Sequence, residues 1–235
     1  MKKVFLFYFI RHGQLVKPYN DHSAMDRNTL ADLALSKLDP GIRANSGTTF
    51  NTQTRGINLS QVKFIYYNNS GFQSRRSLQS AKLIRAELKK KYGITVPVRG
   101  LPELKEIKFY VKKLVNPELF KTEGMPILRK KFFQAILTGG PVEKLTSIQK
   151  RTDKILSVIR RHEQAGERVL FVTHAFFMRF LELALEKKQP TMADMEAAHI
   201  NQYFGGFIYN LKKPALKFFG KPLNWDNSYK ILKQP

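Results

Sequence analysis

A run of seven apolar residues near the N-terminus, followed by three residues of a different kind, constrains this chain most. Residues 4–10 read VFLFYFI, and Arg11, His12 and Gly13 follow at once. An unbroken β-branched and aromatic run is typical of a strand buried on both faces of a parallel sheet. Ligands of open α/β sheets bind beyond the carboxyl ends of such strands. The sequence therefore predicts an anion site at Arg11 and His12, with Gly13 allowing the backbone to turn.

The rest of the chain alternates between short apolar runs and amphipathic segments. The apolar runs predict strands at 62–67, 94–98 and 168–173 and an antiparallel pair at 204–211 and 215–219. The amphipathic segments predict helices at 26–38, 74–92, 117–137 (interrupted near 124–126), 144–164 and 176–185. This alternation is typical of a three-layer α/β/α sandwich, with a mostly parallel central sheet and an antiparallel edge. A length of 235 residues suits one such domain, over residues 1–235.

Charge and composition limit the partners of the chain. The formal net charge is +23 with a pI near 10.2, which attracts anions such as phosphorylated metabolites, acidic membrane surfaces or nucleic acid. The cations are spread along the chain, so they indicate either solvated faces or a functional basic surface. Zero cysteines exclude disulfides and thiolate catalysis. Lys2 and Lys3 before the first apolar run imitate a signal peptide, but the run is short. With no run of the roughly 20 apolar residues that span a bilayer, we expect a soluble, cytoplasmic protein.

A second histidine stands at the end of another predicted strand. His174 directly follows residues 168–173, so His12 and His174 are expected at the same edge of the sheet. Arg76 falls near the start of the helix that follows the second strand, where a helix N-terminus and a guanidinium both favour phosphate. Arg75 competes for that role. His162 lies on the helix predicted over 144–164 and is expected to be exposed.

Four segments, in this order, resemble the motifs of the histidine phosphatase superfamily, also called phosphoglycerate mutase-like. They are residues 9–14 (FIRHGQ), 76–81 (RSLQSA), 104–107 (LKEI) and 170–174 (LFVTH). The second motif begins with an arginine, so the resemblance selects Arg76 over Arg75. The resemblance implies the three-layer fold of that superfamily and a chemistry of phosphoryl transfer that needs no metal ion or cofactor.

The resemblance also implies roles for individual residues in phosphate binding. His12 would attack phosphorus and form a phosphohistidine, which splits one difficult displacement into two easier ones. Arg11, Arg76 and His174 would surround the phosphoryl oxygens and stabilise their charge. The side-chain amide of Gln14 could donate a further hydrogen bond to a phosphoryl oxygen.

The carboxylate implied by the third motif is Glu106. It would protonate the leaving oxygen and then take a proton from the attacking water, with a pKa raised by burial. Glu103 is the runner-up for this role. A surface ion pair with Lys105 or Lys108 is the structural alternative for Glu106. The substrate would be a small phosphorylated molecule or a phosphoprotein.

The segment that would select the substrate is 108–141, which we expect to be a lid or insertion. Its aromatic residues suggest an apolar wall, although core packing explains several of them equally well: Phe109, Tyr110, Phe120, Phe132 and Phe133. Departures from the family pattern at Leu15 and Pro18 disfavour a phosphoglycerate mutase. A non-catalytic module that binds acidic membranes or nucleic acid on the same scaffold is the alternative from another functional class.

Overall fold

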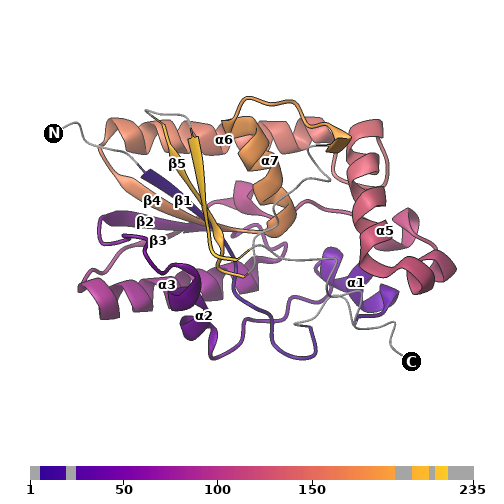
Figure 1. Cartoon of the computed structure of the whole chain (residues 1–235), viewed down its shortest axis with the longest axis horizontal. Coiled ribbons are helices and arrows are strands. Elements are labelled where there is room, and N and C mark those ends of the chain that lie inside the picture. The colour runs from indigo at the N-terminus through magenta and orange to yellow at the C-terminus, as the bar shows by residue number, and fades with distance from the viewer. Residues whose placement is uncertain (1–5, 20–24, 194–202, 212–214, 222–235) are drawn as a thin grey trace.

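A computed structural model describes residues 6–19, 25–193, 203–211 and 215–221. Its centre is a six-stranded sheet with helices on both faces (Figure 1). The strand order is β3-β2-β4-β1-β5-β6. The strands are β1 (Leu6–Arg11), β2 (Val62–Tyr67), β3 (Val98–Gly100), β4 (Arg168–Thr173), β5 (Gly206–Asn210) and β6 (Ala215–Phe219). Residues 4 and 5 of the predicted first strand lie outside the described residues.

The pairing of the strands confirms the predicted fold class. β3, β2, β4 and β1 are paired in parallel, and β5 and β6 add an antiparallel edge beyond β1. Arg11 and Thr173 are partners in the register of β1 and β4. The carboxyl ends of these two strands therefore lie side by side, and the residues that follow them begin at the same edge of the sheet.

The helices lie close to their predicted positions. They are α1 (Arg27–Ala34), α2 (Ser46–Gln53), α3 (Ser74–Tyr92), α4 (Val111–Leu114), α5 (Pro117–Thr138), α6 (Leu145–Gln164) and α7 (Ala175–Leu185), with a 3₁₀ turn at Pro102–Leu104. The sequence did not predict α2 and α4. No helix in the described part of the chain is long and apolar enough to cross a membrane.

β1 is buried on both faces because each face packs against a helical layer. Phe7 and Phe9 belong to the apolar cluster that includes α6 and α7. Tyr8 and Ile10 belong to the cluster that includes α2 and α3. Successive side chains of a strand point to opposite faces, so an unbroken apolar run fills both clusters at once. Figure 1 shows α6 and α7 on one side of the sheet and α2 and α3 on the other.

The predicted interruption of the helix over 117–137 is present within α5. Asn116 caps its start by accepting a hydrogen bond from the Leu119 amide at 2.8 Å. Gly124 then leaves the helical conformation, with φ 62° and ψ −141°. Pro126 follows two residues later, where its missing N–H falls in the first turn of the resumed helix. The kink at Gly124 therefore divides α5 into two helical parts.

The predicted strand at 94–98 is wrong in position. The chain pairs with β2 only over Val98–Gly100, where Ile65 is the partner of Val98. Pro97 precedes this segment, and its carbonyl accepts from the Ile65 amide at 3.0 Å. Because proline has no N–H to donate, regular pairing begins only after it.

The prediction that His162 is exposed is also wrong. His162 is 9% exposed. Its Nε2 lies 2.9 Å from the Tyr66 hydroxyl and its Nδ1 lies 2.6 Å from a carboxylate oxygen of Glu167. Arg160 and Arg161 beside it are exposed, so of these three neighbouring side chains only that of His162 points toward the core.

A buried carboxyl group on α7 predicts a specific pH dependence of stability. Glu182 is 1% exposed, and burial raises its pKa from 4.5 to about 7, although Arg179 donates to it at 2.8 Å. The folded state binds the extra proton, so this contribution is complete below pH 4.5 and is lost as the pH rises through 7. We expect the free energy of unfolding of the wild type to fall by roughly 2–3 kcal/mol, relative to Glu182→Gln, between about pH 5 and 8. Urea unfolding of both proteins at the two pH values measures this difference, and parallel pH profiles would contradict it.

Candidate active site

The ends of β1 and β4 bring two histidines together. The His12 amide donates to the carbonyl of Thr173 at 2.9 Å, which ties the residue after β1 to the last residue of β4. The centroids of the His12 and His174 rings are 5.0 Å apart. Both side chains are buried. The structure therefore brings the two histidines to one edge of the sheet, as the sequence predicts.

His12 is held as a neutral imidazole with one nitrogen available. Its Nδ1 lies 2.8 Å from the carbonyl oxygen of Gly13. A carbonyl can only accept, so Nδ1 carries the hydrogen and Nε2 keeps its lone pair. Burial, and then the neighbouring His174, Arg76 and Arg11, hold the pKa of His12 well below its usual value of 6.5. The ring is therefore an unprotonated potential nucleophile at neutral pH.

Gly13 is needed for close packing rather than for the turn that the sequence suggested. Gly13 is not one of the described glycines whose φ is positive. A Cβ at this position would lie 2.6 Å from the ring of Phe204. The Gly13 amide donates to the Ser80 hydroxyl on α3 at 2.8 Å. A glycine thus allows the chain after His12 to pass between an aromatic ring and α3.

Arg76, and not Arg75, enters the site from the first turn of α3. Arg75 is exposed, whereas Arg76 is buried. The Nε of Arg76 donates to Asp39 at 3.0 Å, and the other oxygen of Asp39 accepts from the Arg75 amide at 2.8 Å. Within the described residues, the buried Nη2 of Arg76 and both ring nitrogens of His174 have no hydrogen-bond partner. Asp39 therefore fixes the guanidinium and leaves one of its nitrogens for a ligand. Nothing in the loop sequence indicated this carboxylate.

Arg11 is oriented by an aromatic ring that the sequence did not single out. Its guanidinium carbon lies 4.2 Å from the ring centroid of Tyr203, a cation–π contact. The same ring is 5.8 Å from that of His12. Tyr203 directly precedes the strand predicted at 204–211, but no pattern in the sequence marks it as part of a site.

Glu106 lies in the same cleft and contacts the N-terminus of α7. One of its carboxylate oxygens accepts from the amides of Ile107 and Phe177, both at 2.9 Å, and the other accepts from the Phe176 amide at 3.2 Å. Burial raises the pKa of Glu106 above 4.5, while these amides and Arg11 oppose the increase. A carboxyl group in this setting keeps its proton to a higher pH than an exposed one, and it can both donate and accept a proton.

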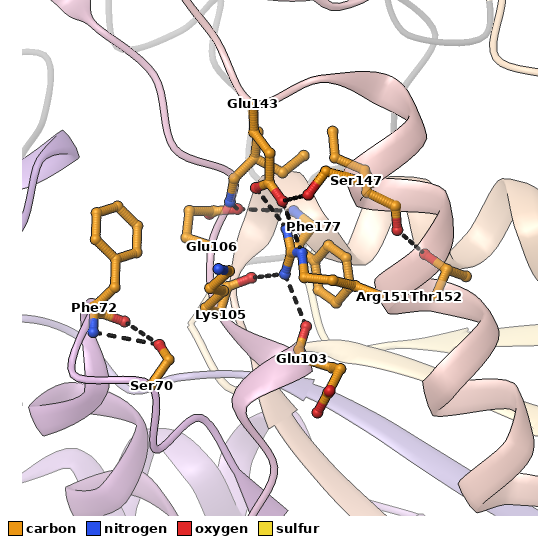
Figure 2. A network of polar contacts seen from close by, with 12 residues as sticks. Ser70, Phe72, Glu103, Lys105, Glu106, Glu143, Ser147, Arg151, Thr152 and Phe177 are labelled. Carbon is orange, nitrogen blue, oxygen red and sulfur yellow. Dashed lines mark hydrogen bonds and ion pairs between the residues drawn. The ribbon is translucent and has the colours of Figure 1, made fainter.

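A buried arginine holds the segment that carries Glu106 (Figure 2). Arg151 on α6 forms two hydrogen bonds with the carboxylate of Glu143, at 3.0 and 2.9 Å. Its Nη1 donates to the backbone carbonyls of Glu103 and Lys105, at 2.8 and 2.7 Å. The paired guanidinium therefore fixes the backbone directly before Glu106.

Two other predicted residues lie away from the cleft. A carboxylate oxygen of Glu103 pairs with the Lys154 ammonium group at 3.2 Å. The side-chain oxygen of Gln14 accepts from Arg43 at 3.2 Å. Neither residue lines the cleft in front of His12. The geometry thus favours Glu106 over Glu103 and gives Gln14 no contact with that cleft.

The cleft in front of His12 has a polar end and an apolar end. His12, Arg11, Arg76 and Glu106 line the polar end, whereas the side chains from α1 and α5 are mainly apolar. His174 is also buried, but it is not among the residues that line this cleft. The described ranges contain no group of three or more His, Cys, Asp or Glu side chains suited to a metal ion. The guanidinium groups of Arg11 and Arg76 give the polar end side-chain donors suited to a tetrahedral oxyanion.

The aromatic residues expected to form an apolar wall are divided between the cleft and the core. Phe109 and Phe132 line the cleft. Phe120 and Phe133 are buried without lining it, and Tyr110 is 36% exposed. Two of the five aromatic residues, Phe120 and Phe133, are therefore explained by core packing, which was the alternative to an apolar wall.

Several solved protein structures have the same fold as this chain. The chain is 19% identical to YhfR of Bacillus stearothermophilus, with a TM-score of 0.61 over 91% of this chain and 95% of that one. It is 16% identical to a mycobacterial glucosyl-3-phosphoglycerate phosphatase (TM-score 0.59, 94% and 98% covered). It is 15% identical to phosphoglycerate mutase from Bacillus anthracis (TM-score 0.55, 93% of each chain covered). Comparison with curated protein sequences gave no match.

Family membership rests on a sequence model rather than on these distant structures. The model of the histidine phosphatase superfamily (branch 1) matches residues 70–202, more than half of the chain. The match contains Arg76, Glu106 and His174, and the fold adds Arg11 and His12 from β1 to the same edge of the sheet. This chain belongs to the histidine phosphatase superfamily.

Proposed function

We propose that the protein hydrolyses phosphomonoesters without a metal ion, through a phosphohistidine on His12. The observation that carries this proposal is the bond between His12 Nδ1 and the Gly13 carbonyl, 2.8 Å long. It leaves Nε2 as a nucleophile in a cleft that also contains two guanidinium groups and a carboxyl group of raised pKa. These are the groups that a two-step displacement at phosphorus requires.

In the first step, Nε2 of His12 forms a bond to phosphorus while the bond from phosphorus to the ester oxygen breaks. Glu106 gives its proton to the departing oxygen, which leaves as an alcohol. Arg11 and Arg76 stabilise the negative charge on the oxygens of the transferring group. In the second step, water attacks phosphorus, Glu106 takes its proton, and inorganic phosphate leaves His12.

Release of phosphate from p-nitrophenyl phosphate in the presence of EDTA tests the reaction. Rapid quenching should also trap a phosphoenzyme that is stable in alkali and labile in acid, as a phosphohistidine is. A requirement for added metal, or turnover without a phosphorylated histidine, would contradict the proposal.

The same assay addresses the other readings of the site. A mutase would pass the phosphoryl group to a second substrate hydroxyl rather than to water. A module that only binds anions on this scaffold would retain phosphate without forming the phosphoenzyme. Either result would replace hydrolysis as the function.

A further inference from the structure

The part of the cleft beyond the phosphoryl-binding end is built almost entirely of hydrocarbon. Leu30 and Leu33 from α1 and Met125, Leu128 and Phe132 from α5 line it. All five side chains are less than a tenth exposed. A group of the substrate that enters this space loses its contact with water and contacts apolar surface instead.

Three aromatic rings form one side of this space. Phe109, Phe132 and Phe176 all line the cleft. The ring centroid of Phe132 lies 4.9 Å from that of Phe109 and 4.6 Å from that of Phe176, with interplanar angles of 64° and 40°. Tilted rings at these separations hold one another in place. They offer a preformed wall for a flat or cyclic group.

The polar residues near this space do not form a site for sugar hydroxyl groups. No residue that lines the cleft in the described chain is a serine, threonine, tyrosine, asparagine or aspartate. The side-chain amide nitrogen of Gln73 already donates to the Leu33 carbonyl at 3.0 Å. From α5, the cleft also receives the positively charged side chain of Arg129, whose guanidinium carbon lies 5.7 Å from the Phe133 ring centroid. A buried hydroxyl without a partner costs about 1–3 kcal/mol, whereas apolar surface gains about 25 cal/mol per Å².

We infer that the preferred substrates are phosphomonoesters of apolar cyclic alcohols or phenols, and not of sugars or polyols. The inference rests on the proposed hydrolysis at His12. It assigns substrate selection to side chains of α1, of α5, of Phe176 at the start of α7, and of Phe109 and Val111. Phe109, Val111 and α5 belong to the expected lid at 108–141. The ring of the leaving group lies against Phe109, Phe132 and Phe176.

Two esters of similar shape test this selection. Cyclohexylmethyl phosphate and glucose 6-phosphate both carry a primary phosphate on a six-membered ring, but only the sugar carries ring hydroxyls. We expect kcat/KM for cyclohexylmethyl phosphate to be higher by at least about tenfold. Equal values, or a preference for glucose 6-phosphate, would overturn the inference. So would a tenfold preference for 3-phosphoglycerate that disappears in Arg129→Gln, because the site would then select an anionic group.

Two matched substitutions locate the selection in the cleft. Val111 lines the cleft, whereas Val115, four residues later, does not, and both are buried in the same cluster. Val111→Thr should lower the preference for the cyclohexylmethyl ester at least threefold, and Val115→Thr should leave it unchanged. Met125→Gln, which keeps the length of the side chain, should lower the same preference to a similar extent. It serves as the cleft variant if Val111→Thr does not fold. An unchanged preference in the folded cleft variants overturns the inference.

Failure of the inference and failure of the proposed function give different results. If p-nitrophenyl phosphate and both test esters are turned over at similar rates, hydrolysis stands and the selectivity is wrong. If none is turned over, hydrolysis is wrong. Titration calorimetry with cyclohexylmethyl phosphonate and glucose 6-phosphonate then tests the wall separately, and equal affinities would overturn it.

Discussion

His12→Asn is expected to reduce the turnover of p-nitrophenyl phosphate by at least about 10³-fold and to abolish the phosphoenzyme. Asparagine can still place a side-chain nitrogen near the Gly13 carbonyl, which accepts from Nδ1 of His12 at 2.8 Å. It has no atom at the position of Nε2, so no bond to phosphorus can form. Vanadate binding should persist, because Arg11 and Arg76 are unchanged. Rapid-quench labelling and steady-state kinetics measure the two effects.

His162→Asn is the matched control for this substitution. His162 is likewise a buried histidine, but its two nitrogens form hydrogen bonds with Tyr66 and Glu167 away from the cleft. Its replacement should affect the free energy of unfolding and leave the turnover of folded protein within a few-fold. Similar losses of turnover in the two variants would mean that His12 supports the fold and is not the nucleophile.

Glu106→Gln is expected to have an effect that depends on the leaving group. With an alkyl phosphate, the departing oxygen needs a proton, and loss of the general acid should cost about 10² to 10⁴ in kcat/KM. With p-nitrophenyl phosphate, the phenolate leaves without one, and the loss should be less than about tenfold. Glu103→Gln is the control, because Glu103 pairs with Lys154 outside the cleft. It should leave the turnover of both esters unchanged.

The pH dependence gives a second readout of Glu106. Burial raises its pKa above 4.5, so the proton that it donates persists at a higher pH than in an exposed carboxyl group. Turnover of the alkyl ester should therefore fall as the pH rises through this pKa, and the variant should lack that fall. Equal losses of kcat/KM on both esters would instead indicate that Glu106 acts by holding the N-terminus of α7. The Phe176 and Phe177 amides at that terminus donate hydrogen bonds to its carboxylate.

The fold class and the position of the two histidines could be predicted because they depend on local pattern. An apolar run long enough to fill both faces marks β1 and β4, and the residue after each run must lie at the carboxyl edge. α2 could not be predicted, because the segment SGTTFNTQ contains one large apolar residue, Phe50, and mostly poor helix formers. Tertiary packing of Phe50 against Phe204 supports this helix instead.

The partners of the site residues could not be predicted from the sequence because they come from distant parts of the chain. Asp39 reaches Arg76 across 37 positions, and Arg151 reaches the Lys105 carbonyl across 46. Neither contact follows from the period of a strand or a helix. The sequence marks the residues at the ends of strands, whereas the groups that orient them depend on how distant loops and helices pack around the sheet.

The unpaired nitrogen at the polar end is expected to couple folding to the concentration of phosphate. Arg76 Nη2 is buried without a partner among the described residues, which lowers the stability of the folded protein. An oxyanion that binds it only in the folded state adds RT ln(1 + [L]/Kd), about 2.7 kcal/mol at 100 times Kd. Inorganic phosphate, the product of the proposed reaction, would then act as a folding ligand. The melting temperature of this protein should rise with the phosphate concentration of the buffer. Its lifetime against proteolysis should lengthen in the same way.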